Sequence, residues 1–138
     1  MSIYLDTSVL VAGLTFEPDS ARAQALLSRR AAWVISEWTA AEFSAAIRTK
    51  ARGGFLATDQ APVLEAALAD IMSRHGRPLP IQPEDIRQAR LLVMRDDGVR
   101  APDAVHIAAA LRIGAGLATL DTIQARVAGA AGLEVIVP

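Results

Sequence analysis

Short apolar runs alternate with longer amphipathic stretches along the whole chain. The apolar runs predict four buried strands, at residues 3–5, 33–35, 117–120 and 135–137. In the stretches between them apolar residues recur three or four positions apart, which predicts helices at 7–14, 21–30, 37–52, 58–74, 84–95, 102–113 and 122–130. Strands that alternate with helices in this way are typical of an α/β fold whose mainly parallel sheet carries helices on both faces.

Residues 78–81 form a further extended segment, in which two prolines flank Leu79. Proline cannot donate a hydrogen bond to a neighbouring strand, so proline-containing strands lie at the edges of sheets. We therefore expect this segment at the edge, which brings the sheet to four or five strands.

Length and composition indicate one globular domain, residues 1–138. Apolar residues make up 52% of the chain, which excludes disorder, yet no apolar run reaches the roughly 18 residues of a membrane span. The first residues lack the basic and then apolar pattern of a signal peptide. The absence of cysteine excludes disulfides and thiolate metal sites. We expect a cytoplasmic protein without a membrane segment.

The net charge of −1 does not by itself indicate a nucleic-acid binder. If several acids are gathered in one site, however, the rest of the surface is positive. Thirteen of the fourteen basic residues are arginine, which suits bidentate contacts to phosphate. A general preference for arginine over lysine explains the same composition equally well.

Four acids occupy related positions in the predicted fold. Asp6 directly follows the first strand and Asp121 directly follows the strand at 117–120. Glu42 and Asp103 lie near the beginnings of two helices beside those strands. The carboxyl ends of parallel strands meet at one edge of a sheet, where such folds bind ligands. We expect the four carboxylates to converge there and to repel one another unless a cation binds between them.

The candidate ligands are all oxygen donors, and hard ligands of this kind favour Mg²⁺ or Mn²⁺ over zinc. Each acid also has a simpler interpretation, because Asp6, Asp103 and Asp121 could stabilise helix N-termini. Glu42 could complete a capping box with Thr39. The joint occurrence of four acids favours the metal site over four separate caps.

Four segments carry a resemblance to a known family, in its order and at similar spacing. They are residues 4–10 (YLDTSVL), 36–43 (SEWTAAEF), 102–108 (PDAVHIA) and 117–121 (LATLD). The chain resembles the PIN-domain ribonucleases, specifically the VapC-type toxins of type II toxin–antitoxin systems. The resemblance implies a three-layer α/β/α fold, a homodimer, and metal-dependent cleavage of RNA that leaves a 5′-phosphate and a 3′-hydroxyl. It also implies inhibition by a VapB-like antitoxin in the active-site groove.

By this resemblance Asp6, Glu42, Asp103 and Asp121 are the catalytic and metal-binding quartet. Two small polar residues, Ser8 and Thr119, match positions that support the site, Ser8 by bonding a ligand carboxylate or a metal-bound water. The chain departs from many relatives after Asp121, where residues 122–124 (TIQ) replace an aspartate and an aromatic residue. Whether Asp121 binds the metal directly or through water therefore stays open.

Four further residues are weaker candidates. His106 lies three residues after Asp103, so it could donate to that acid or titrate near neutral pH, although a structural role is more common. Arg48, Lys50 and Arg52 follow Glu42 on the same predicted helix and could contact the RNA backbone. A solvated helix end accounts for them more simply.

The predicted function is hydrolysis of RNA phosphodiester bonds by a Mg²⁺- or Mn²⁺-dependent endoribonuclease. A phosphatase, dehalogenase or receiver domain would use Asp6 as a nucleophile or phosphate acceptor. The first two usually need an acid where this chain has Ser8, and all need a late lysine, whereas Lys50 is the sole lysine. Two alternatives remain: an inactive PIN-like module that binds RNA or protein, and a PIN nuclease outside a toxin–antitoxin pair.

Overall fold

The computed structural model describes residues 1–138. Its helices and strands follow the order β1 (Ser2–Leu5), α1 (Thr7–Leu14), α2 (Ser20–Leu27), β2 (Ala32–Val34), α3 (Glu37–Arg52), α4 (Gln60–His75), α5 (Pro83–Arg95), α6 (Ala101–Ile113), β3 (Gly116–Ala118), α7 (Thr122–Ala130) and β4 (Val135–Ile136). Every strand and helix expected from the hydrophobic pattern is present, with boundaries shifted by a few residues. No helix has the length and apolar character needed to cross a membrane.

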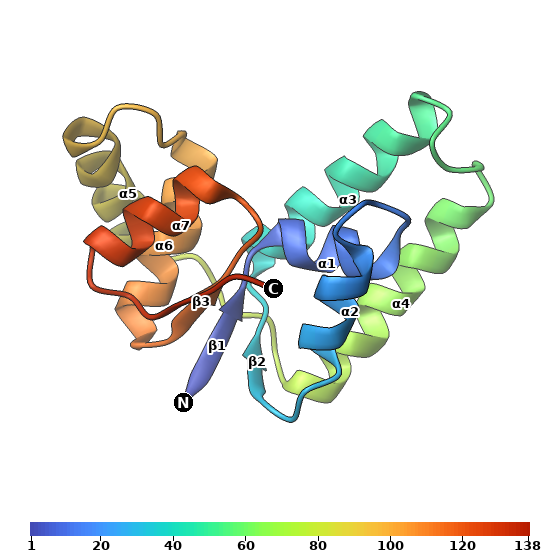
Figure 1. Ribbon diagram of the computed structural model, residues 1–138, viewed down its shortest axis with the longest axis horizontal. Helices are drawn as coiled ribbons and strands as arrows, with labels where there is room; N and C mark the ends of the chain where they lie inside the picture. Colours follow the sequence, from blue (N-terminus) through green and yellow to red (C-terminus); the bar gives the residue numbers. More distant parts are fainter.

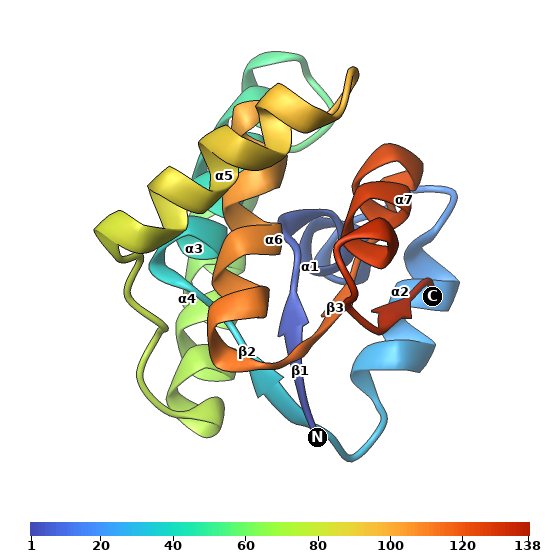
Figure 2. The ribbon, with the colours of Figure 1, turned by 90° about the vertical axis from the view of Figure 1, so that its left-hand side faces the viewer.

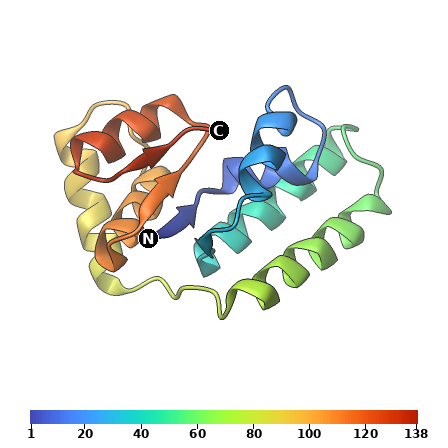
Figure 3. The same ribbon diagram turned by 60° about the horizontal axis from the view of Figure 1, so that its bottom comes forward.

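The four strands form one parallel sheet in the order β2-β1-β3-β4 (Figure 3). In the centre, Ile3 of β1 lies opposite Trp33 of β2 on one side and Gly116 of β3 on the other. A side chain at position 116 would approach the carbonyl oxygen of Glu134 to 3.3 Å, so glycine permits the close approach of β4. The predicted parallel sheet is confirmed.

The segment at 78–81 is not a fifth strand. Leu79 makes one isolated parallel bridge to Ser36, through hydrogen bonds from its own N–H to Ile35 and from the N–H of Glu37 to its carbonyl. Pro78 and Pro80 have no N–H groups with which to extend this ladder. The segment therefore lies at the edge of the sheet, beside β2, as a single extended contact.

Helices cover both faces of the sheet and enclose two apolar cores. Helices α5, α6 and α7 pack on one face and α1 to α4 on the other (Figures 1 and 2). Successive side chains of a strand point to opposite faces. Tyr4 and Leu117 accordingly enter the first core, whereas Leu5 and Ala118 enter the second. This is the expected three-layer α/β/α arrangement.

Three neighbouring strands end at the same edge of the sheet and deliver polar residues there. Asp6 follows β1, Ser36 follows β2 by two residues, and Thr119 follows β3. Helix α6 leads directly into β3, and its N-terminus lies at this edge, where the side-chain amide of Gln124 donates to the carbonyl of Asp103. The topology therefore gathers residues that are far apart in the sequence.

Candidate metal centre

Asp6 is the buried centre of the site, with 4% of its surface exposed. It is the N-cap of α1, and its Oδ2 accepts hydrogen bonds from the Ser8 backbone N–H at 3.3 Å and the Ser8 hydroxyl at 2.5 Å. The hydroxyl of Thr119 also donates to Oδ2, at 2.9 Å. Ser8 and Thr119 thus orient the carboxylate, as expected. The other oxygen, Oδ1, is 3.4 Å from Nε2 of His106.

Glu42 approaches Asp6 from α3. Its Oε2 accepts from the hydroxyl of Thr7 at 2.9 Å and lies 2.5 Å from Nε2 of His106. Burial pushes the pKa of Glu42 upward, but the hydrogen bonds from His106 and Thr7 and the charge of Arg100 outweigh burial and lower it. Glu42 is therefore held as a carboxylate at neutral pH.

The capping-box interpretation of Glu42 is wrong. The N-cap of α3 is Ser36, whose hydroxyl oxygen accepts the backbone N–H of Thr39 at 2.9 Å. Glu42 thus lies in the second turn of α3, beyond the first-turn position that can reach back to an N-cap. Its carboxylate turns instead toward α1 and α6.

Asp103 and Asp121 flank this pair. Oδ2 of Asp103 accepts from Nε of Arg100 at 3.0 Å. Burial raises the pKa of Asp103 against the opposing ion pair with Arg100, and the charges of Asp121 and Asp6 add to the rise. Asp121 caps α7 through Oδ1, which accepts the N–H of Gln124 at 2.8 Å, so its predicted capping role is confirmed.

All four acids share one feature: a single carboxylate oxygen takes every hydrogen bond that the chain supplies. The oxygens without a hydrogen bond from the chain are Oδ1 of Asp6, Oε1 of Glu42, Oδ1 of Asp103 and Oδ2 of Asp121. An acidic set with one oxygen held and one oxygen available suits a hard divalent cation such as Mg²⁺, which binds few carboxylates and retains water.

The tightest group of possible ligand atoms comes from Asp6, Glu42 and His106, which lie within 4.8 Å of one another. Asp103 and Asp121 are not part of this tightest group. The pKa of Asp103 is raised mainly by its burial, with smaller contributions from the charges of Asp121 and Asp6. The residues present therefore fit a divalent ion held mainly by Asp6 and Glu42, with Asp103 and Asp121 beside them.

The spacing of three residues suggested that His106 could donate to Asp103, but the structure shows no hydrogen bond between them. It is fully buried, and its two ring nitrogens face Tyr4 and Glu42. Residues one turn apart on α6 are neighbours along the helix, but the ring of His106 points into the core.

Several residues of the site could not be assigned from the sequence alone. Thr7, the residue after Asp6, donates its hydroxyl to Glu42. Gln124 belongs to the segment that departs from the family pattern. It is fully buried, its side-chain amide donates to the carbonyl of Asp103 at 3.1 Å, and its carbonyl is 2.6 Å from the Thr119 hydroxyl. The polar side chain of Gln124 among apolar neighbours was the available signal.

The three basic residues predicted to contact RNA do not form one patch. Lys50 pairs with Glu17 at 2.7 Å, on the side of α3 that faces the α1–α2 loop. Arg48 and Arg52 are exposed and lie one turn apart, on a different side of the helix. Contact with RNA stays a prediction for all three, and Lys50 would have to leave Glu17 to make it.

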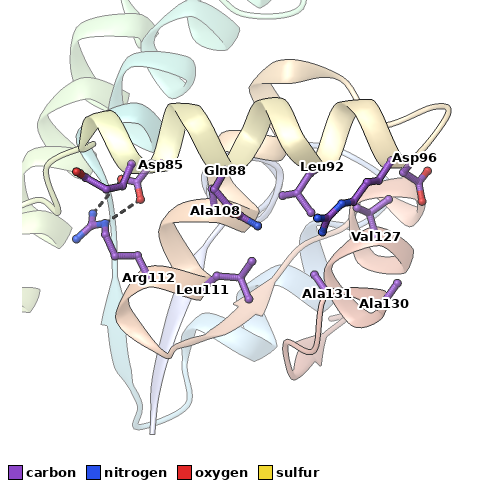
Figure 4. A pocket seen from close by; sticks show the side chains of 12 residues that line it. Asp85, Gln88, Leu92, Asp96, Ala108, Leu111, Arg112, Val127, Ala130 and Ala131 are labelled. Atoms are coloured by element: carbon purple, nitrogen blue, oxygen red, sulfur yellow. Dashed lines mark hydrogen bonds and ion pairs between the residues drawn. The ribbon is translucent and has the colours of Figure 1, made fainter.

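A groove of about 690 Å³ lies away from the acids, between α5, α6 and α7 (Figure 4). Its floor is apolar and includes Leu92, Leu111 and Val127. Most charged residues that line it are paired within the chain, as in the ion pair between Arg112 and Asp85, whereas Arg95 makes no ion pair. The groove contains none of the four acids.

Comparison with known proteins agrees with this architecture. The structure is similar to VapC20 of Mycobacterium tuberculosis, described as a sarcin–ricin loop cleaving toxin, with TM-score 0.72 and 21% identity over 99% of each chain. It is also similar to FitAcB from Neisseria gonorrhoeae, with TM-score 0.67 and 22% identity over 97% of this chain and 96% of that one. VapBC2 from Rickettsia felis, bound to promoter DNA, matches with TM-score 0.71 and 14% identity over 100% of this chain and 99% of that one.

The TM-scores establish a shared fold. No curated protein matches the sequence. A family model described as PIN domain, however, matches residues 3–130, which include all four acids and the whole central part of the sheet. The chain therefore belongs to the PIN domain family.

Proposed function

We propose that the chain is a Mg²⁺- or Mn²⁺-dependent endoribonuclease and the toxin of a type II, VapBC-like toxin–antitoxin pair. This proposal rests on one observation. In each of the four acids, one carboxylate oxygen accepts hydrogen bonds from the chain and the other accepts none. Carboxylates that served only as caps or ion pairs would have no need to meet at one edge of the sheet.

The chain's own groups define the roles of the acids. Asp6 and Glu42 would bind the ion, and the hydroxyls of Ser8, Thr119 and Thr7 fix their orientation. A bound divalent ion supplies a nucleophilic water and stabilises the charge that develops on the phosphate. Asp103 would bind the ion directly.

Asp121 would act directly or through water, because one of its oxygens already caps α7. The pKa of Asp103 is raised by burial and by its acidic neighbours, which is the electrostatic conflict that a cation relieves. A site of this kind binds metal at the cost of stability in the metal-free chain.

The fold supports the proposed biological role. Structures of similar fold include the FitAcB complex, the VapBC2 complex and the VapC20 toxin. We infer by analogy a VapB-like antitoxin as partner, a homodimer as the assembly, RNA as the substrate and the cytoplasm as the location.

The test is an RNA-cleavage assay on the purified chain with Mn²⁺, with Mg²⁺ and with excess chelator. We expect cleavage only with metal, and 5′-phosphate ends on the products. Asp6→Asn should abolish activity, because an amide is a poor ligand for a hard cation. Asp59→Asn is the matched control, since Asp59 is an exposed carboxylate in the turn before α4 whose side chain makes no capping hydrogen bond, and it should keep full activity.

Cleavage by the Asp6→Asn variant at the wild-type rate would refute the mechanism. Complete inactivity of the wild type with either metal would favour a binding module without catalysis. Activity without a neighbouring gene for a small DNA-binding protein would indicate a PIN nuclease that acts outside a toxin–antitoxin pair.

A further inference from the structure

A chain of buried hydrogen bonds lies directly behind the carboxylates. The hydroxyl of Tyr4 is 2.9 Å from Nδ1 of His106 and 2.5 Å from the hydroxyl of Ser36. Ser36 in turn accepts the backbone N–H of Thr39. Tyr4, Ser36, Thr39 and His106 are all 0% exposed. Polar groups so deeply buried remain there only if each donor finds an acceptor, and no buried side-chain nitrogen or oxygen lacks a partner.

The surroundings of His106 decide where its ring proton lies. Nε2 faces two carboxylate oxygens, Oε2 of Glu42 at 2.5 Å and Oδ1 of Asp6 at 3.4 Å. An ionised carboxylate accepts hydrogen bonds and donates none. Nε2 must therefore carry a proton, and in the neutral ring Nδ1 is then the nitrogen that accepts a hydrogen bond.

The remaining hydroxyl protons can be placed in the same way. Thr39 donates its hydroxyl to the carbonyl of Leu5 at 3.1 Å. The hydroxyl of Ser36 accepts the backbone N–H of Thr39 and has two oxygens to which it can donate, that of Thr39 at 3.0 Å and that of Tyr4 at 2.5 Å; we assign its proton to the nearer one, Tyr4. The phenol of Tyr4 has a single proton, and because its oxygen accepts from Ser36, that proton can be donated to Nδ1 of His106. This assignment uses every proton once.

The same geometry argues against His106 as a metal ligand. Two adjacent ligands of one octahedral Mg²⁺, each about 2.1 Å from the ion, lie about 3.0 Å apart. Nε2 of His106 and Oε2 of Glu42 are only 2.5 Å apart, which is the length of a direct, charge-assisted hydrogen bond. Oε1 is then the oxygen that Glu42 can offer to a cation.

We propose that Tyr4 is a positioning residue of the metal centre: its hydroxyl donates to Nδ1 and pins the ring of His106 with the Nε2 proton on Glu42. His106 is an orienting donor rather than a ligand, and it turns Oε1 of Glu42 toward the ion. The metal-binding part rests on the proposed function, whereas the protonation of the ring can be measured without it.

The first experiment is ¹⁵N NMR of the histidine side chains in the full-length, metal-free protein. The chain has only two histidines, and the exposed His75 serves as an internal reference. We expect a proton on Nε2 of His106, a hydrogen-bonded and unprotonated Nδ1, and persistence of the Nε2 proton at saturating Mg²⁺. A proton on Nδ1, or loss of the Nε2 proton when Mg²⁺ binds, would overturn the proposal.

The second experiment removes only the hydroxyl, in Tyr4→Phe. The Nδ1 resonance should move to the position of an imidazole without a hydrogen bond, and the Kd for Mn²⁺ should rise on the order of 10-fold, the usual effect of losing a group that orients a ligand. Thr15→Val is the matched control, because it deletes another buried hydroxyl, one that donates to Val11 away from the carboxylates. It should leave the Kd unchanged.

If Tyr4→Phe does not fold, His106→Gln and His106→Ala provide an independent test. The glutamine keeps an N–H donor for Glu42, so it should bind Mn²⁺ more tightly than the alanine variant. Equal affinities, or a Tyr4→Phe protein with unchanged NMR signals and unchanged Kd, would refute the role of Tyr4. Absence of RNA cleavage alongside the expected NMR result would refute the proposed function and leave this proposal standing.

Discussion

The ion pair between Asp85 and Arg112 fastens α5 to α6, the helix that carries Asp103 and His106 (Figure 4). Asp85 is only 1% exposed. Its carboxylate accepts from Nε and Nη2 of Arg112 at 2.8 and 3.0 Å and from the backbone N–H of Gln82 at 2.8 Å. Arg112 also donates to the carbonyl of Pro80. The negative charge of Asp85 therefore depends almost wholly on Arg112 for compensation.

Replacing Arg112 by methionine should leave that carboxylate buried and without a cation. Loss of one partner of a buried ion pair costs about 3–5 kcal/mol, and the 29% exposure of the Arg112 side chain admits some water. We expect the lower end, about 3 kcal/mol, which corresponds to a fall in Tm of about 10 °C. In an Asp85→Asn background the same change should cost less than about 1 kcal/mol, because no buried charge is stranded.

The assay is urea denaturation of the wild type, the two single variants and the double variant, followed by circular dichroism. Arg87→Met is the control, since Arg87 pairs with Glu84 on the exposed side of α5, and it should change the free energy of unfolding by less than about 0.5 kcal/mol. The reasoning fails if Arg112→Met costs under about 1 kcal/mol, or if it costs the same with Asp85 and with asparagine at that position.

Three further predictions concern the site and the helix that carries it. Asp121→Ser should preserve the cap of α7 and keep the free energy of unfolding within about 0.5 kcal/mol of the wild type, whereas Asp121→Ala should lower it by about 1 kcal/mol. Both variants should bind Mn²⁺ more weakly in calorimetry. Wild-type affinity in the serine variant would show that Asp121 only caps the helix. Because the pKa of Asp103 is raised, its ionisation destabilises the metal-free fold, so Asp103→Asn should raise the Tm at pH 7. That gain should vanish below the ordinary pKa of 3.8, where the acid is protonated in both states; a lower Tm at pH 7 would contradict it. Gly114→Ala should cost about 1 kcal/mol in denaturant, because Gly114 ends α6 at a φ of +65°, and an unchanged midpoint would be inconsistent with that strain.

The hydrophobic pattern was sufficient to predict the layers and the strands, because burial on a sheet or a helix repeats with a fixed period. It was also sufficient to place Asp6 directly after β1, whereas Asp121 lies three residues beyond the end of β3 and not directly after it as expected. The hydrophobic pattern could not predict the partner of His106. Spacing within α6 indicates neighbours on that helix, whereas the partner, Glu42, belongs to α3.

Other differences have the same origin. Asp85 reads as an ordinary first-turn acid of α5, and only the packing of α6 reveals that it is buried. The segment at 78–81 has the composition of an edge strand. The number of residues that pair depends on which backbone groups beside β2 are accessible, and only one bridge forms. Sequence patterns report local preferences, and contacts between elements are decided by the assembled fold.

The crossover topology also has a consequence during synthesis. Asp6 acquires its hydrogen bond from Thr119 only after another 113 residues of chain have been made. At about 5–20 residues per second, this delay is about 6–23 s. Throughout that interval the N-terminal acids exist without their later neighbours, and β1 lacks β3, its partner in the centre of the sheet. A nascent chain that is still on the ribosome is thus expected to be chemically inert, and activity would begin only after the last third of the protein has been translated.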